Sequence, residues 1–153
     1  MDARFVSRSA VFVALRDKEG KVLLHRRANT GFMDGRYDLP SGHVEKDEPV
    51  LQSAARELQE ETGISVAESG LRLWHINQFA ANGEYYYNFF FVVDDWEGEP
   101  TIMEPQKCDD MQFFALDTLP KLTAGSHVAL AHIGSDHVTF GYIDQAVFEE
   151  IAA

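Results

Sequence analysis

The segment from Glu48 to Thr62 constrains the fold most, because its hydrophobic periodicity is that of an amphipathic helix. Apolar residues recur there at positions i, i+3, i+4 and i+7 and form a single stripe, made of Leu51, Ala54, Ala55 and Leu58. Asp47 and Glu48 place negative charge at the helix N-terminus, and Gly63 suits the C-terminal cap. The sequence therefore predicts a helix over residues 48–62 that packs its apolar stripe against a core.

The same segment carries three carboxylates on a second face. Glu57, Glu60 and Glu61 follow the i, i+3, i+4 spacing and project about 115° away from the apolar stripe. Such crowded like charges repel unless they share a cation, and oxygen ligands suit Mg²⁺ or Mn²⁺ better than zinc. The alternative is an exposed acidic helix stabilised by pairing of Arg56 with Glu60. Spacing alone leaves both interpretations open.

Short strands and one further helix account for most of the remaining pattern. Runs rich in aliphatic and aromatic residues predict strands over residues 5–15, 22–24, 37–40, 71–80, 85–93 and 112–116. The first two strands are predicted to form a hairpin through Asp17–Gly20, and Ser126 is predicted to cap a helix over residues 126–133. The tail from Val138 is ambiguous. No repeat or linker divides the chain, so we expect one α/β or α+β domain over residues 1–153.

Composition and charge exclude several classes of protein. The 153 residues include 18 aromatic residues (11 Phe, 5 Tyr and 2 Trp), which argues against disorder. A net charge of −12 argues against binding of a nucleic acid polymer, although residues 1–41 carry a net +3 and residues 42–64 a net −4. The longest apolar run, Phe89–Val93, is too short for a membrane span, and Met1–Arg4 does not begin a signal peptide. We expect a cytoplasmic protein without a membrane partner.

A longer motif surrounds the predicted helix. Gly42 is followed after five residues by Glu48 and after seven more by Arg56-Glu57-Leu58-Gln59-Glu60-Glu61-Thr62-Gly63-Ile64. This 23-residue stretch resembles the Nudix box at all nine specified positions. The resemblance implies a MutT-like protein with a single Nudix domain, folded as an α/β/α sandwich around a mixed β-sheet. It also implies hydrolysis of a diphosphate linked to another moiety, with Mg²⁺ or else Mn²⁺ as cofactor.

The resemblance also assigns roles to the residues of the box. It implies that Glu57, Glu60 and Glu61 are catalytic residues that ligate the metal, together with the backbone carbonyl of Ser41. Many relatives have glycine at the position of Ser41, so this residue is a departure from the pattern. Glu48 is expected to stabilise the loop through Arg56, and Gly42 is expected to allow a tight turn.

Further site residues lie outside the box. Glu104, four residues after the proline of Trp96–Pro100, resembles a glutamate of MutT-type members that acts as metal ligand or general base, and the alternative is one more acid in an acidic loop. Arg27 is expected to hold substrate phosphate, whereas Arg26 is expected on the other face of its strand. The candidate neighbours of a substrate base are His43, Phe32 and Tyr37. The aromatic run 85–91 is expected to be strand core more than a stacking platform, with Tyr85, Tyr87 and Phe89 on one face.

These assignments predict an enzyme that acts on a small nucleoside diphosphate derivative. The preferred substrate is a nucleoside triphosphate, cleaved to a monophosphate and pyrophosphate. The alternatives are a nucleotide-sugar or dinucleoside polyphosphate pyrophosphatase, or a Nudix module that binds a nucleotide without cleaving it. No residue near 124–127 securely matches the asparagine with which MutT-type enzymes read 8-oxo-dGTP, and exposed aromatic residues allow a homodimer.

Overall fold

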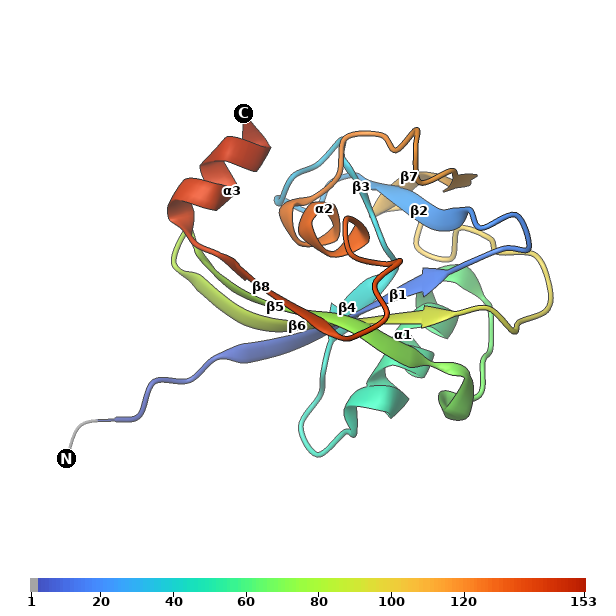
Figure 1. Ribbon diagram of the computed structural model, residues 1–153, viewed down its shortest axis with the longest axis horizontal. Helices are drawn as coiled ribbons and strands as arrows, with labels where there is room; N and C mark the ends of the chain where they lie inside the picture. Colours follow the sequence, from blue (N-terminus) through green and yellow to red (C-terminus); the bar gives the residue numbers. More distant parts are fainter. Residues whose placement is uncertain (1–2) are drawn as a thin grey trace.

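The computed structural model describes residues 3–153 and places helices on both sides of two β-sheets (Figure 1). A five-stranded sheet of order β4-β1-β6-β5-β8 contains β1 (Arg8–Leu15), β4 (Ser41–His43), β5 (Arg72–Ala81), β6 (Glu84–Val93) and β8 (Thr139–Ile143). A three-stranded sheet of order β3-β2-β7 contains β2 (Val22–Arg27), β3 (Tyr37–Asp38) and β7 (Cys108–Phe114). The helices are α1 (Val50–Thr62), α2 (Ala124–Leu130) and α3 (Gln145–Ala152), with a 3-10 turn at Glu68–Gly70.

The five-stranded sheet is mixed, as the predicted fold class requires. Strand β1 runs parallel to β6 and antiparallel to β4, while β5 runs antiparallel to β6 and parallel to β8. Because side chains alternate along a strand, β6 serves two cores. Phe90 and Val92 pack on the side of α2, whereas Phe91 and Val93 pack on the side of α1 with Leu58. The α/β architecture predicted from the sequence is therefore confirmed.

The predicted hairpin between the first two strands is wrong. Asp17–Gly20 forms a turn, but only one antiparallel bridge, between Arg16 and Val22, joins the two strands. Beyond that bridge β1 and β2 separate into different sheets, since β1 pairs with β4 and β6 while β2 pairs with β3 and β7. The turn residues indicate only that the chain reverses at Asp17–Gly20. They do not show which strands, distant in sequence, pair with β1 and β2.

Helix α1 begins at Val50, two residues later than predicted, and ends where the sequence indicates. Gly63 caps it with φ +78°, and the Gly63 N–H donates to Gln59 O at 2.9 Å. The buried residues include Ala54 and Leu58, but Leu51, which was expected inside, is 40% exposed. Leu51 points in nearly the same direction as Leu58, so its exposure is not a matter of helix face. It lies in the first turn, about 10 Å from Leu58 along the helix axis.

The C-terminal part of the chain differs from its prediction in two places. Helix α2 starts at Ala124, and the residue at its N-cap is Thr123, so Ser126 lies inside the helix and does not cap it. The Ser126 hydroxyl instead donates to Asp38 Oδ1 at 2.5 Å, a partner 88 residues away. The ambiguous tail forms β8 and α3, and Asp144 caps α3 by accepting from Val147 N.

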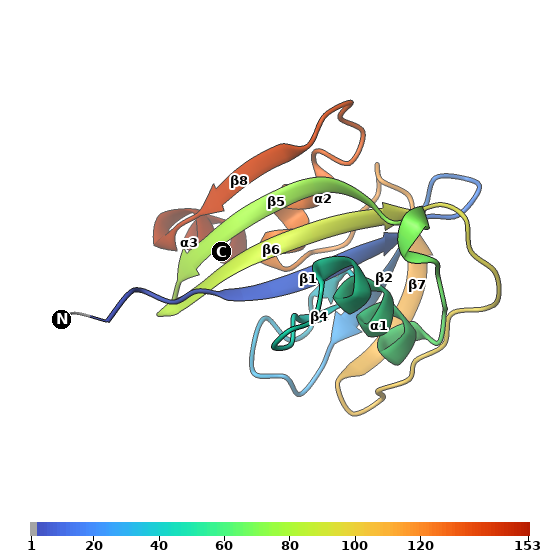
Figure 2. The ribbon, with the colours of Figure 1, turned by 90° about the horizontal axis from the view of Figure 1, so that it is seen from below.

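One half of the five-stranded sheet carries exposed aromatic side chains. Tyr85, Tyr87, Phe140 and Tyr142 are 39% to 64% exposed. The register pairs Gln78 with both Tyr87 and Tyr142, so these rings share one face of the sheet. Figure 2 shows α1 in front of the β1 end of the sheet, with β5 and β8 extending beyond it. Within residues 3–153, no helix is both long and apolar enough to cross a membrane.

Candidate active site

A cleft of about 940 Å³ receives side chains from both sheets and from α1. Its apolar and aromatic lining comes from β1, β5 and β6 and includes Phe12, Phe79 and Tyr86. Its charged lining comes from β2, β3, α1, the start of β6 and the segments before α1 and β7, and consists of Arg27, Asp38, Glu45, Glu57, Glu60, Glu61, Glu84, Glu104 and Lys107, with the imidazole of His25 near Glu61. The cleft therefore joins an acidic end to an aromatic surface.

Arg56 organises the acidic end of the cleft. Its Nε and Nη2 donate to the two carboxylate oxygens of Glu48 at 2.6 and 3.0 Å, and Nη2 also donates to the His43 carbonyl at 3.1 Å. Its Nη1 donates to Glu57 at 2.9 Å and to Glu60 at 3.1 Å. The fork on Glu48 lowers the pKa of that carboxyl to about 2, so Glu48 stays ionised. The contact between Glu48 and Arg56 is the one expected from the sequence.

Gly42 makes room for Glu57 and does not form a turn. It lies within β4, and a Cβ added there would stand 1.9 Å from Cδ of Glu57. The tight turn expected at this residue is therefore wrong. The absence of a side chain is what allows α1 to bring the Glu57 carboxylate directly against the backbone of β4. Burial raises the pKa of Glu57, although Arg56 acts in the opposite direction.

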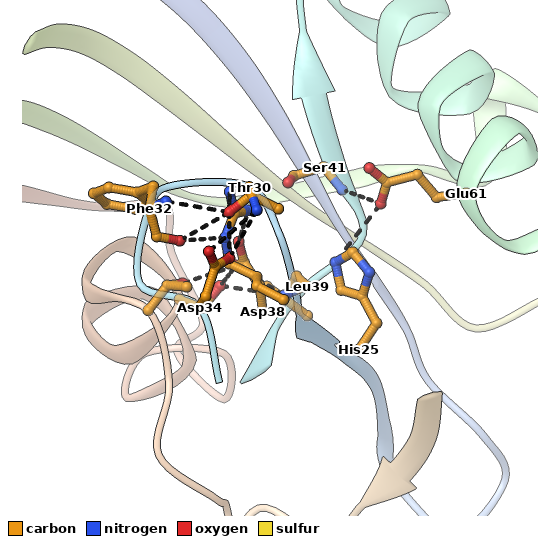
Figure 3. A network of polar contacts seen from close by, with 11 residues as sticks. His25, Thr30, Phe32, Asp34, Asp38, Leu39, Ser41 and Glu61 are labelled. Carbon is orange, nitrogen blue, oxygen red and sulfur yellow. Dashed lines mark hydrogen bonds and ion pairs between the residues drawn. The ribbon is translucent and has the colours of Figure 1, made fainter. Parts of the chain in front are cut away.

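Glu61 is a second largely buried carboxylate of α1, with 16% of its side chain exposed. Its Oε2 accepts a hydrogen bond from the Ser41 N–H at 3.0 Å and lies 3.7 Å from Nε2 of His25 (Figure 3). Burial raises its pKa well above the ordinary range, and the charges of Glu57, Asp38 and Glu104 act in the same direction. A cation bound here would relieve this repulsion.

The backbone of Ser41 faces the same region. Val13 N donates to Pro40 O and Val44 N donates to Ser9 O, at 2.9 and 3.0 Å. In an antiparallel ladder these flanking bonds leave the Ser41 N–H and carbonyl directed away from β1. The N–H is taken up by Glu61, and the carbonyl lies on the same open edge of β4. Its position is compatible with the metal-ligand role expected from the resemblance.

The donor set at this end of the cleft fits a hard divalent cation. Glu57, Glu61 and the Ser41 carbonyl supply oxygen atoms, and Glu60 stands at the rim with a half-exposed side chain. In the described part of the chain, no three His, Cys, Asp or Glu side chains already converge on one metal position. Mg²⁺ does not require such a cage, because it commonly takes one or two carboxylates and completes its shell with water and substrate phosphates.

Arg27 lies in the cleft but is held by the neighbouring loop. Its Nε donates to Phe32 O at 2.8 Å, Nη2 donates to Thr30 Oγ1 at 3.0 Å, and Nη1 lies 3.4 Å from Asp38 Oδ2. Its guanidinium also covers the Phe32 ring at 5.5 Å. Arg26, on the alternate face of β2, pairs with Asp109 and does not line the cleft.

The other expected contacts divide between the cleft and the core. His43 lines the cleft and stacks on Tyr86 at 5.5 Å, and Phe32 and Glu104 also line it. Tyr37 does not: its ring packs on Phe114 and its hydroxyl donates to Asp110. The alternation of β3 accounts for this, because it directs Asp38 into the cleft and Tyr37 to the opposite side.

The polar residues of the cleft that sequence reasoning missed include three with buried side chains. Asp38 accepts from Leu39 N, Thr123 Oγ1 and Ser126 Oγ, and Asn88 donates to Asn77 Oδ1 at 2.9 Å. The third is His25, whose pKa is lowered by burial. Alternation within the aromatic run indicates a second face at Tyr86 and Asn88, which was the available signal. For Asp38 and His25 no local signal existed, since their partners are distant in sequence.

Comparison with known proteins identifies the family. The family model of the NUDIX domain matches residues 6–132, which include the β4–α1 segment and most of the cleft. The chain belongs to the Nudix family. Nudix hydrolases are pyrophosphohydrolases that act on nucleotide substrates and generally use divalent metal ions, so this chain is an enzyme of that class.

Individual Nudix relatives agree with this assignment. The chain is 29% identical over 103 residues to the 8-oxo-dGTP diphosphatase of Escherichia coli, which covers 67% of this chain and 78% of that protein. It is 35% identical over 107 residues to the ADP-ribose pyrophosphatase of Methanocaldococcus jannaschii, but the match spans only 61% of that relative and 69% of this chain. The crystal structure of the MutT NUDIX hydrolase from Burkholderia pseudomallei superposes with a TM-score of 0.78 at 30% identity, over 84% of this chain and 99% of that one.

Proposed function

We propose that this Nudix enzyme hydrolyses a nucleoside triphosphate to a nucleoside monophosphate and pyrophosphate, with Mg²⁺ as its cofactor and Mn²⁺ as a substitute. The observation that carries the proposal is the placement of two largely buried carboxylates, Glu57 and Glu61, at one end of a cleft whose other end is aromatic. Charged phosphates and an apolar base require these two environments in one cavity.

The reaction needs a positioned water and compensation of phosphate charge. Water attacks the β-phosphorus, and the bond from that phosphorus to the oxygen that bridges it to the α-phosphorus breaks. The nucleoside monophosphate leaves with the bridging oxygen, and the attacking water becomes part of pyrophosphate. A bound divalent cation would neutralise phosphate oxygens and lower the pKa of a coordinated water. Glu57 and Glu61 would hold the cation with Glu60 and the Ser41 carbonyl, while Glu104 would ligate it or accept the proton of the attacking water.

The roles proposed for the remaining residues follow their contacts. Arg56 orients Glu57 and Glu60 and is itself fixed by Glu48, so both act through the carboxylates that they position. Arg27 contributes positive charge beside the phosphates while its loop contacts keep the guanidinium in place. Phe32 and His43 lie where they can contact the base.

The cleft of about 940 Å³ has room for a small nucleotide such as a nucleoside triphosphate. The E. coli relative is named for 8-oxo-dGTP and the M. jannaschii relative for ADP-ribose, which supports a nucleotide with a diphosphate linkage as the common element. Comparison of 8-oxo-dGTP with ordinary nucleoside triphosphates tests for selection of an oxidised guanine.

The proposal is tested by product release across a substrate panel. Pyrophosphate is measured with nucleoside triphosphates and 8-oxo-dGTP, and the released nucleotide is measured with nucleotide sugars, ADP-ribose and dinucleoside polyphosphates, whose cleavage frees no pyrophosphate, each with Mg²⁺ and with Mn²⁺. Glu61→Gln should lower kcat on the order of 100-fold or more, whereas Glu68→Gln, an exposed glutamate outside the cleft, should leave it unchanged. Nucleotide binding without turnover of any substrate would favour the non-catalytic module.

We also propose that residues 1–153 form one cytoplasmic domain that associates with a second copy of itself. The aromatic face is formed by β5, β6 and β8. Its residues Ile76, Gln78, Tyr85, Tyr87, Phe140 and Tyr142 are all uncharged. Copies of a chain with net charge −12 repel one another least through such a face. Sedimentation velocity should show a dimer that Phe140→Asp dissociates and that Leu116→Asp, an exposed apolar residue elsewhere, does not. A monomeric wild type contradicts this part.

A further inference from the structure

His25 is a buried histidine of the cleft with an unmet bonding requirement. Its side chain is only 10% exposed, yet its Nε2 has no hydrogen-bond partner among residues 3–153. Strand β2 directs the ring at α1, where Glu61 Oε2 lies 3.7 Å from Nε2 (Figure 3). That separation is too long for a hydrogen bond. Because buried polar atoms are rarely left without a partner, this arrangement indicates that something binds between the two side chains.

The separation of the two atoms suits a shared small cation. Two donors at about 2.1 Å from one ion lie roughly 3–4 Å apart, depending on the angle between them. The Ser41 N–H holds the Glu61 carboxylate in its orientation at 3.0 Å. Asp38 and Glu104 add negative potential at Glu61. The position between His25 and Glu61 is therefore fixed by neighbouring contacts and electrostatically favourable for a cation.

We propose that His25 Nε2 ligates the divalent cation together with Glu61, as a nitrogen ligand in addition to the oxygen ligands expected from the Nudix box. The inference rests on the proposed function, since it concerns the same metal site. An imidazole nitrogen is a poorer ligand for Mg²⁺ than for transition-metal ions such as Mn²⁺. His25 should therefore raise the preference of the site for Mn²⁺ over Mg²⁺.

Pulsed electron paramagnetic resonance of Mn²⁺ bound to the full chain tests the assignment without measuring activity. A directly bound imidazole nitrogen modulates the spin echo, and ¹⁵N-labelling of histidine alters that modulation. We expect the signal in the wild type, in His43→Gln and in the exposed control His137→Gln, and we expect its loss in His25→Gln. His25→Gln should also weaken Mn²⁺ binding about tenfold or more, with a smaller effect on Mg²⁺, so that the ratio of the two affinities falls.

The outcomes separate this inference from the proposed function. Mn²⁺-supported turnover with no nitrogen modulation, or with modulation that survives in His25→Gln, overturns the ligand assignment and leaves the function standing. Absence of both Mn²⁺ binding and turnover overturns both. If His25→Gln does not fold by circular dichroism, the wild type and His43→Gln decide, because His25 and His43 are the histidines that line the cleft. Modulation that persists in His43→Gln then assigns it to His25.

Discussion

At the scale of single residues, the site depends on one side chain with many partners and on one missing side chain. Arg56 donates to three carboxylates and one carbonyl, so the acidic end of the cleft is organised by a single guanidinium. Gly42 contributes by its lack of a Cβ, which lets Glu57 reach the backbone of β4. Both residues act on the position of Glu57, one by attraction and the other by leaving space.

Gly42→Ala should therefore displace Glu57. The new Cβ would stand 1.9 Å from Cδ of Glu57, so the carboxylate has to move or β4 has to shift. We expect a loss of about 1–3 kcal/mol in the free energy of unfolding and a fall in kcat of about tenfold or more. Thermal denaturation and steady-state kinetics measure the two effects. Gly134→Ala is the matched control, since a Cβ there would meet no atom within 4 Å, and equal effects in both variants would contradict the argument.

At the scale of elements, one buried carboxylate joins three parts of the chain. Asp38 on β3 accepts from Thr123 at the N-cap of α2 and from Ser126 within α2. Its other oxygen faces Arg27 on β2 at 3.4 Å. The two-residue strand β3 has few ladder hydrogen bonds of its own, so this network fixes where β3, α2 and the Arg27 loop meet beside the cleft.

Two substitutions at Asp38 should separate these links. Asp38→Ala removes every hydrogen bond to the side chain and should cost about 3 kcal/mol of stability. Asp38→Asn keeps an oxygen for Leu39, Thr123 and Ser126 but presents an amide to Arg27, so we expect a loss of about 1–2 kcal/mol. Urea denaturation measures both changes. Asp109→Asn, at an exposed pair with Arg26, is the control and should change stability by less than about 1 kcal/mol. Equal losses in the two Asp38 variants would be inconsistent with a divided role.

At the scale of the whole molecule, a buried histidine couples the sheet to the C-terminal elements. His75 on β5 bonds Thr139 of β8 through Nδ1 at 2.6 Å and stacks on His132, which follows α2. Its Nε2 has no partner among residues 3–153 and lies close to Gly141 of β8. Burial, and secondarily the charge of His132, lowers the pKa of His75 from 6.5 to about 4.

This histidine makes the fold sensitive to acid. The unfolded chain binds a proton to the imidazole at a higher pH than the folded chain does, so stability is full above pH 6.5 and falls as the pH drops towards 4. We expect His75 to account for a loss of about 2 kcal/mol between pH 7 and pH 4.5. Urea denaturation at both pH values should show a smaller pH dependence in His75→Gln than in the wild type. The exposed control His137→Gln should retain the wild-type dependence, and a parallel loss in His75→Gln would refute the assignment.

Local chemistry accounts for what could be predicted in advance. The spacing of Ala54 and Leu58, the cap at Gly63 and the pairing of Glu48 with Arg56 all involve residues within one turn or two of the same helix or its entry loop. Failures occurred where a distant partner intervened. Ser126 is a good capping residue by type, but its hydroxyl donates to Asp38 instead. The predicted hairpin does not extend because β1 pairs with β6 and β2 pairs with β7, both of which come later in the sequence.

The sequence by itself determined the family, the helix of the Nudix box and the face on which Glu57, Glu60 and Glu61 project, because periodicity and motif spacing are properties of neighbouring residues. Only the tertiary structure decided which of these carboxylates become buried and what they meet there. Glu61 contacts Ser41 and His25, which lie 20 and 36 positions away, because α1 packs where β4 of one sheet and β2 of the other approach each other. Such long-range contacts set the environments of Glu57 and Glu61, and burial is what raises the pKa of these two carboxyl groups.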